Sequence, residues 1–137
     1  MINDKTLQFS ADQALTATAA STDHLDLVQD RDIGPGTPLW LVIVSKAAPG
    51  GTSPTIAISI ETDDNSGFSS AATLTTHPTI AGANFGLGTM VVIPWPFENE
   101  RYNRVKYTLG GTSPTFTVDA FLTNQPPPNW KAYPDAI

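Results

Sequence analysis

A six-residue sequence occurs twice in this chain of 137 residues, and it constrains the fold more than any other feature. Gly-Gly-Thr-Ser-Pro-Thr occupies residues 50–55 and recurs, letter for letter, at residues 110–115. Glycine allows a turn with positive φ, and a proline at the first residue of a strand removes no ladder hydrogen bond. Convergent turn chemistry could explain two such loops. The flanking strands also match in phase, however, so we predict two equivalent β-hairpins in two halves of a double-sheet fold.

Alternating apolar and polar residues accompany both copies. Val105, Tyr107 and Leu109 occupy one side of a predicted strand, and the residues between them are polar or charged. A period of two is typical of a sheet with one face toward water. Threonine favours strands, and glycine and proline punctuate the turns. The pattern predicts strands at residues 6–10, 15–19, 24–27, 39–46, 55–62, 72–75, 89–94, 101–109 and 115–123. We therefore expect an all-β domain, a jelly-roll β-sandwich.

Charge and composition exclude several classes of function. Thirteen acidic residues against seven basic ones give a net charge of −6, which disfavours binding to nucleic acid or to anionic membranes. The chain has no cysteine, so it can form neither a disulfide nor a thiolate metal site. No secretory signal is visible at the N-terminus, and the longest apolar run, residues 39–44, is far shorter than the roughly twenty residues of a membrane-spanning helix. We expect a soluble protein made in a cytoplasm.

Residue types that serve in catalysis are present without a supporting motif. His24 and His77 do not accompany a nucleophile-elbow sequence, so we interpret both as structural. The acidic run at residues 63–67 resembles the start of a calcium loop, but the twelfth position holds Leu74, and a turn explains the run equally well. A third pattern, Glu98 and Glu100, suggests a glycosidase pair, but no neighbour in sequence would raise their pKa values. We predict no enzyme, and neither catalytic, cofactor nor metal residues.

The C-terminal segment differs from the rest of the chain. Three consecutive prolines at 126–128 cannot continue a sheet and favour an extended polyproline conformation. Trp130 and Tyr133 follow them, and aromatic side chains on a stiff arm bind a partner with little loss of entropy. The alternative is that both rings fold back onto their own domain. We predict a domain at residues 1–123 and an extended Pro-rich arm at 124–137.

Two loops hold further candidate contact residues. Arg31 lies between Asp30 and Asp32, where it either shapes the loop or contacts a partner. Trp95 is flanked by two prolines, which suggests a surface position suited to a carbohydrate or a protein partner. Trp40 lies in an apolar strand, and we expect it in the core.

Several motifs together carry a family resemblance. They are Asp-Lys at 4–5, Phe-Ser-Ala-Asp-Gln-Ala at 9–14, Thr-Ala-Thr-Ala-Ala-Ser-Thr at 16–22, Asp-Leu at 26–27, Arg-Asp-Ile-Gly at 31–34, Arg-Tyr at 101–102 and Gly-Gly-Thr at 110–112. On these residues the chain resembles the Bbp16-type capsid cement proteins of tailed bacteriophages. The resemblance extends to about Thr123, with the N-terminal third its most specific part, and it does not include the Pro-rich tail.

The resemblance implies a jelly-roll protein on the outer surface of the mature phage head, made in the host cytoplasm. Its partners would be the major capsid protein and further copies of itself, as a homodimer or homotrimer, and it would have no catalytic residues. For the contacts we predict aromatic and arginine side chains at loops and ends. These are Phe9, Arg31, Trp95, Arg101, Trp130 and Tyr133. The main alternative is a carbohydrate-binding jelly-roll module that uses Trp95 or Trp130. A small hydrolase based on a histidine is a weaker alternative.

Overall fold

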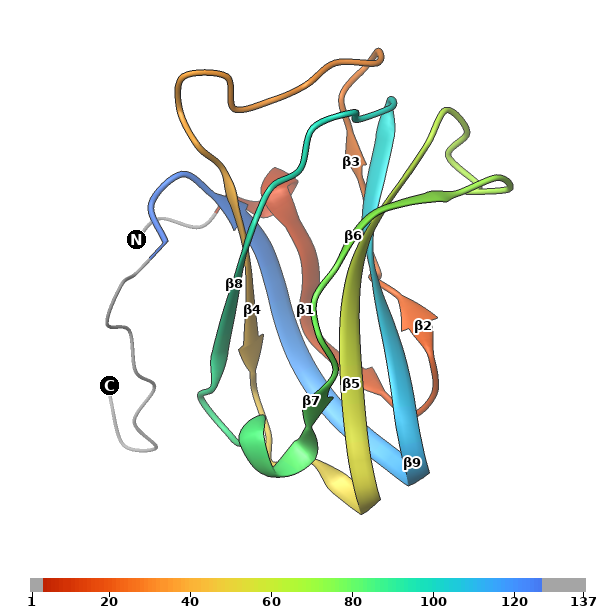
Figure 1. The fold of residues 1–137 in the computed structure, drawn as a ribbon, viewed down its shortest axis with the longest axis vertical. Coiled ribbons are helices and arrows are strands. Elements are labelled where there is room, and N and C mark those ends of the chain that lie inside the picture. The colour runs from red at the N-terminus through yellow and green to blue at the C-terminus, as the bar shows by residue number, and fades with distance from the viewer. Residues whose placement is uncertain (1–3, 127–137) are drawn as a thin grey trace.

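The chain is all-β, as the alternating pattern predicted (Figure 1). The computed structural model describes residues 4–126, and in that range the only helical elements are two single 3-10 turns. No helix among these residues is long and apolar enough to cross a membrane. The elements are η1 (Lys5–Leu7), β1 (Gln8–Leu15), β2 (Ala19–Ala20), β3 (Leu25–Asp26), β4 (Trp40–Ser45), β5 (Gly50–Asp63), β6 (Ala72–Thr76), β7 (Ile80–Ala81), η2 (Gly82–Asn84), β8 (Met90–Pro94) and β9 (Tyr102–Thr123).

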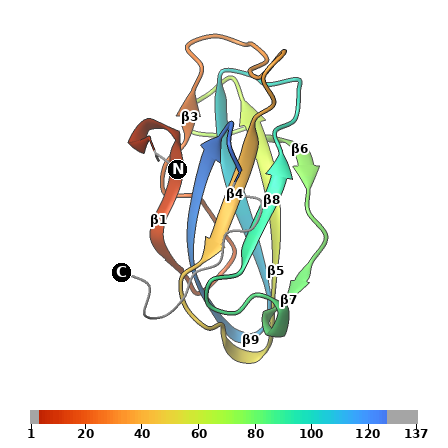
Figure 2. The ribbon, with the colours of Figure 1, turned by 90° about the vertical axis from the view of Figure 1, so that its left-hand side faces the viewer.

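Strand β9 organises the fold because it takes part in both layers of a curled antiparallel sheet. Its first half pairs with β5, β2 and β3, and its second half pairs with β1 and β4. The remaining strands extend the layers, with β8 next to β4, and β6 and β7 next to β5. Figure 2 shows β1, the second half of β9, β4 and β8 side by side as one layer, with β5 and the first half of β9 behind them. The two strands predicted at 101–109 and 115–123 are therefore one strand of 22 residues.

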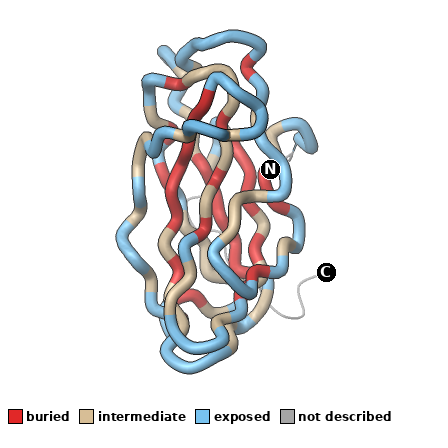
Figure 3. Tube along the Cα trace, turned by 90° about the vertical axis from the view of Figure 1, so that its right-hand side faces the viewer, coloured by how far each residue is buried: buried red, intermediate tan, exposed pale blue. Residues whose placement is uncertain are grey.

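The core lies between the two layers and follows the predicted alternation. Ile56, Ile58 and Ile60 are fully buried, as are Val105 and Tyr107 on the neighbouring strand. Buried residues follow the central strands, while exposed residues occupy the loops at both ends and the outer edges of the molecule (Figure 3). The hydrophobic effect is proportional to the apolar area removed from water, so these paired faces supply most of the stabilisation.

The repeated sequence does not form two hairpins, so that prediction was wrong. The two copies pair with each other, in the register Gly50 with Thr115, Thr52 with Thr112 and Thr55 with Gly110. Register shifts on both sides of Thr52 show that each copy bends its strand as a bulge instead of reversing it. The expected positive φ is present, at 100° in Gly51 and 97° in Gly111. The repeat is thus one antiparallel crossing, built from two identical bends, where β9 passes from one layer to the other.

Candidate functional site at the loop end

Two long loops meet at the end of the molecule opposite the crossing (Figure 1). One joins β3 to β4 and the other joins β8 to β9. They are tied together because Asn99 donates to the Asp32 carboxylate from its backbone N–H at 3.1 Å and from its side chain at 3.2 Å. The backbone N–H of Trp95 also donates to the Leu39 carbonyl at 2.9 Å. The two loops therefore form one connected surface.

Trp95 and Phe9 are core residues, which corrects their prediction as partner contacts. Trp95 is 7% exposed and Phe9 1%, and their rings stack with centroids 5.7 Å apart. The indole N–H of Trp95 donates to Asn99 Oδ1 at 3.0 Å, which satisfies its one polar atom. Trp95 therefore cannot serve as an exposed platform for a sugar. The signal was present in the sequence, because Trp95 lies two residues after the buried Ile93 and so shares its face.

An apolar groove of about 380 Å³ lies at this end. Trp40, expected in the core, is half-buried and lines the groove together with Trp95 and Phe97. Ile33, Leu39 and the prolines at 35, 38 and 94 complete most of its wall. Leu41 is buried toward the core, and the alternation of β4 therefore points Trp40 to the other side.

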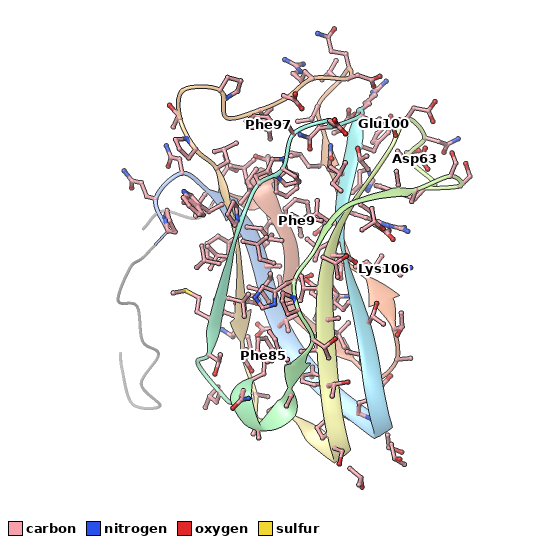
Figure 4. All side chains as sticks on the ribbon, viewed as in Figure 1. Phe9, Asp63, Phe85, Phe97, Glu100 and Lys106 are labelled. Atoms are coloured by element: carbon pink, nitrogen blue, oxygen red, sulfur yellow. The ribbon has the colours of Figure 1, made fainter. Side chains whose placement is uncertain are left out.

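Within residues 4–126, the two most exposed large apolar side chains were not among the predicted contacts. Phe97 is 60% exposed and Val28 67%, one in each of the two loops. In Figure 4 Phe97 lies at the loop end, whereas Phe9 and Phe85 lie between the layers. An aromatic residue between Pro96 and Glu98, in a loop that cannot continue a strand, was the available sequence signal.

Arg31 shapes its loop through the main chain. Its side chain is exposed, and both Nε and Nη2 donate to the Leu27 carbonyl. These bonds fit the first of the two predicted roles, although they go to this carbonyl and not to the flanking acids. One of those acids, Asp32, binds Asn99 instead. A contact between the exposed Arg31 and a partner stays a prediction.

Arg101 is half-exposed and forms a two-point ion pair. Its Nε lies 2.8 Å from Asp26 Oδ1 and its Nη2 3.0 Å from Asp26 Oδ2. The guanidinium also lies 4.8 Å from the centroid of the Tyr102 ring. Hydrogen bonds from Arg101, and then from the Val28 backbone, lower the pKa of Asp26 from 3.8 to about 2. Arg101 therefore already has a partner within its own chain.

We expect this ion pair to make the free energy of unfolding depend on pH in the acidic range. Because the pKa of Asp26 is lower in the folded chain, its contribution is present above pH 4 and is lost as the pH falls toward about 2. Urea unfolding of the wild type and Asp26→Asn across this range tests the prediction. The difference in unfolding free energy should be largest above pH 4 and narrow steadily below it. A difference that does not change with pH would contradict this assignment.

Acidic side chains gather at the same end of the molecule. Asp63 is buried and accepts hydrogen bonds from the backbone N–H groups of Asn65 at 3.0 Å and Ser70 at 2.8 Å, so the calcium-like run is a turn held by its first residue. The pKa of Glu100 is raised, first by burial and then by Asp64, Asp30 and Asp63. Sequence neighbours gave no reason for that shift, because Asp63 ends strand β5, Asp64 begins the loop after it, and Asp30 lies in the β3–β4 loop. Between residues 4 and 126 no group of three or more histidine or acidic side chains is arranged to hold a metal ion.

Both histidines have structural surroundings. His24 packs edge-on against Phe68 and Tyr102, with ring centroids 5.8 and 5.6 Å away. His77 Nδ1 lies 2.8 Å from the Pro78 carbonyl oxygen. These contacts agree with the structural interpretation of the two residues, while the absence of enzyme activity stays a prediction. Trp130 and Tyr133, the remaining predicted contacts, lie outside the described residues.

Comparison with known proteins gives one finding. The model of the family described as Bbp16 matches residues 9–122, which run from β1 almost to the end of β9 and include both loops of the groove. No curated protein matches the chain.

Proposed function

The chain belongs to the Bbp16 family, and on this basis we propose that it is a structural cement protein of a tailed-bacteriophage head. It binds the outer surface of the mature shell and fastens neighbouring major capsid subunits. The family match over residues 9–122 is the observation that carries the proposal. The finer assignments of a jelly-roll topology, a Pro-rich C-terminal arm and a homodimer or homotrimer belong to the same proposal.

A protein with this role needs a stiff body and a surface that meets its neighbours. The long strand β9 joins both layers, and loops at one end expose Phe97 and Val28. A contact of micromolar affinity corresponds to about 8 kcal/mol, and a protein that touches two capsid subunits gains further through effective concentration. Many such contacts together resist internal pressure on the shell.

The contact surface of the proposal differs from the predicted residue set. Arg31 and Arg101 remain at the loop end, and Phe97 and Trp40 take the place of the buried Phe9 and Trp95. Trp130 and Tyr133 are proposed as further contacts through the arm.

Co-sedimentation with phage heads tests this function. We expect the protein to pellet with mature, expanded heads and to bind free capsid subunits about a hundredfold more weakly, because the composite site exists only in the lattice. The double variant Trp130→Ala and Tyr133→Ala measures how much the arm contributes to the affinity for heads. A wild-type protein that stays in the supernatant at micromolar concentration would remove the proposal.

A further inference from the structure

The groove has the shape and surface of a site for an apolar side chain. Glycines and apolar residues make up its whole lining, and its volume of about 380 Å³ falls within the range of ordinary ligand sites. Phe97, 60% exposed, lines it. An exposed aromatic ring beside an apolar groove is the kind of surface that marks an interaction site on a soluble protein.

The walls of the groove are held in place before any partner arrives. Trp95 is fixed by its stacking on Phe9 and by its bond to Asn99, and Asn99 in turn holds the opposite loop through Asp32. In that loop the Thr37 backbone N–H donates to the Gly34 carbonyl at 3.2 Å. A preformed site binds more tightly because little ordering is needed on association.

The surroundings of the groove are acidic. Asp32 directly precedes the lining residue Ile33, and Glu98 directly follows Phe97. The pKa of Glu100 is raised partly by other acids, so negative charge is in excess at this end. Of the two arginines here, Arg101 is paired with Asp26. Arg31 donates to the Leu27 carbonyl, and its one positive charge is outnumbered by the carboxylates of Asp30, Asp32, Glu98 and Glu100 in the same two loops. A partner with positive charge beside its apolar anchor would relieve this repulsion, and complementary potential is what selects partners at such surfaces.

We propose that this groove binds a partner segment in which an apolar side chain is flanked by lysine or arginine. The inference rests on the proposed function, because the segment would belong to the capsid subunit. Trp40 and Phe97 contact the apolar side chain, while Asp30, Asp32 and Glu98 face the flanking cations.

Two synthetic peptides provide the probe. Both have a Pro-Leu-Pro centre, with two lysines on each side in one peptide and two glutamates in the other. Titration of the full chain, followed by NMR shifts of the groove residues, should show the lysine peptide binding about tenfold more tightly at low salt. That advantage should largely disappear in 1 M NaCl, where the screening length is about 3 Å.

Matched variants locate the site. Phe97→Ser should weaken binding of the lysine peptide about tenfold, whereas Leu87→Ser, at a similarly exposed apolar residue (54%), should leave it unchanged. Glu98→Gln should weaken it about threefold. Thr112→Lys makes the same change in net charge on the exposed crossing at the opposite end and should have little effect. Circular dichroism confirms that each variant is folded.

Four outcomes would overturn the docking site. The first is equal affinity for the two peptides, and the second is an equal loss of peptide affinity in Phe97→Ser and Leu87→Ser. The third is self-association of the wild type that Phe97→Ser abolishes. The fourth is a chain that binds the lysine peptide only when it carries the double substitution Trp130→Ala and Tyr133→Ala. The third would assign the groove to a second copy and the fourth to the C-terminal segment of the chain itself.

The head assay separates this inference from the proposed function. If the wild type does not pellet with heads, the proposed function fails whatever the peptides show. If the wild type and Phe97→Ser pellet equally well, the cement role stands and the groove is not the docking site.

Discussion

Replacing Gly111 with alanine is expected to lower the free energy of unfolding by about 3 kcal/mol, and Gly51→Ala should do the same. Both glycines have positive φ, and a Cβ on Gly111 would lie 2.5 Å from the Ser53 carbonyl oxygen. On Gly51 it would lie 2.5 Å from the corresponding oxygen of Ser113. Since the clashing atoms belong to the backbone of the other copy, neither strand can move without breaking the crossing. Urea unfolding followed by circular dichroism measures the loss.

Two other glycines separate backbone strain from this clash. Gly36 has a φ of 79°, and no atom lies near the position of a Cβ. Gly36→Ala should therefore lower the free energy of unfolding only by the backbone strain, about 1 kcal/mol. Gly86 has open space and no positive φ, and Gly86→Ala should change stability by less than about 0.5 kcal/mol. If Gly111→Ala were no worse than Gly36→Ala, the close approach of the two copies would be refuted.

The backbone conformation of the repeat could be predicted from its own residues, but the strand with which it pairs could not. Gly-Gly-Thr-Ser-Pro-Thr correctly indicated positive φ and a bent backbone, because these depend on each residue's own sterics. A hairpin turn and a bulged crossing need the same local chemistry, however, and they differ only in the partner strand. That partner lies in the other copy, at 110–115 for the copy at 50–55. Pairing at such separation is decided by the fold as a whole.

The alternation of apolar residues was informative for the opposite reason. Whether Ile58 faces the core depends on its neighbours two residues away, so the inner faces of β5 and β9 could be predicted from the sequence. The loop between β8 and β9 has no such period. Phe97 and Trp95 both follow a proline there; Trp95, one residue past the end of β8, still shares the face of Ile93, but the exposure of Phe97 beyond it depends on tertiary contacts.

We expect Trp95→Ala to cost about 4 kcal/mol of unfolding free energy, the usual loss for a large aromatic side chain in a core. The substitution removes a ring that stacks on Phe9 and leaves Asn99 Oδ1 without the indole N–H. It also removes a wall of the groove, so the remaining folded protein should bind the lysine-flanked peptide less well. Urea unfolding and the peptide titration measure the two effects separately.

Trp95→Phe distinguishes packing from the hydrogen bond. Phenylalanine keeps most of the buried apolar area and the stacking on Phe9, but it cannot donate to Asn99, so we expect a smaller loss of about 1–2 kcal/mol. Because Asn99 still donates to Asp32, the two loops stay joined and the peptide affinity should change little. A Trp95→Ala protein as stable as the wild type would mean that the indole is a surface group after all. The Phe9 stacking, the linked loops and the preformed groove would then all have to be abandoned together.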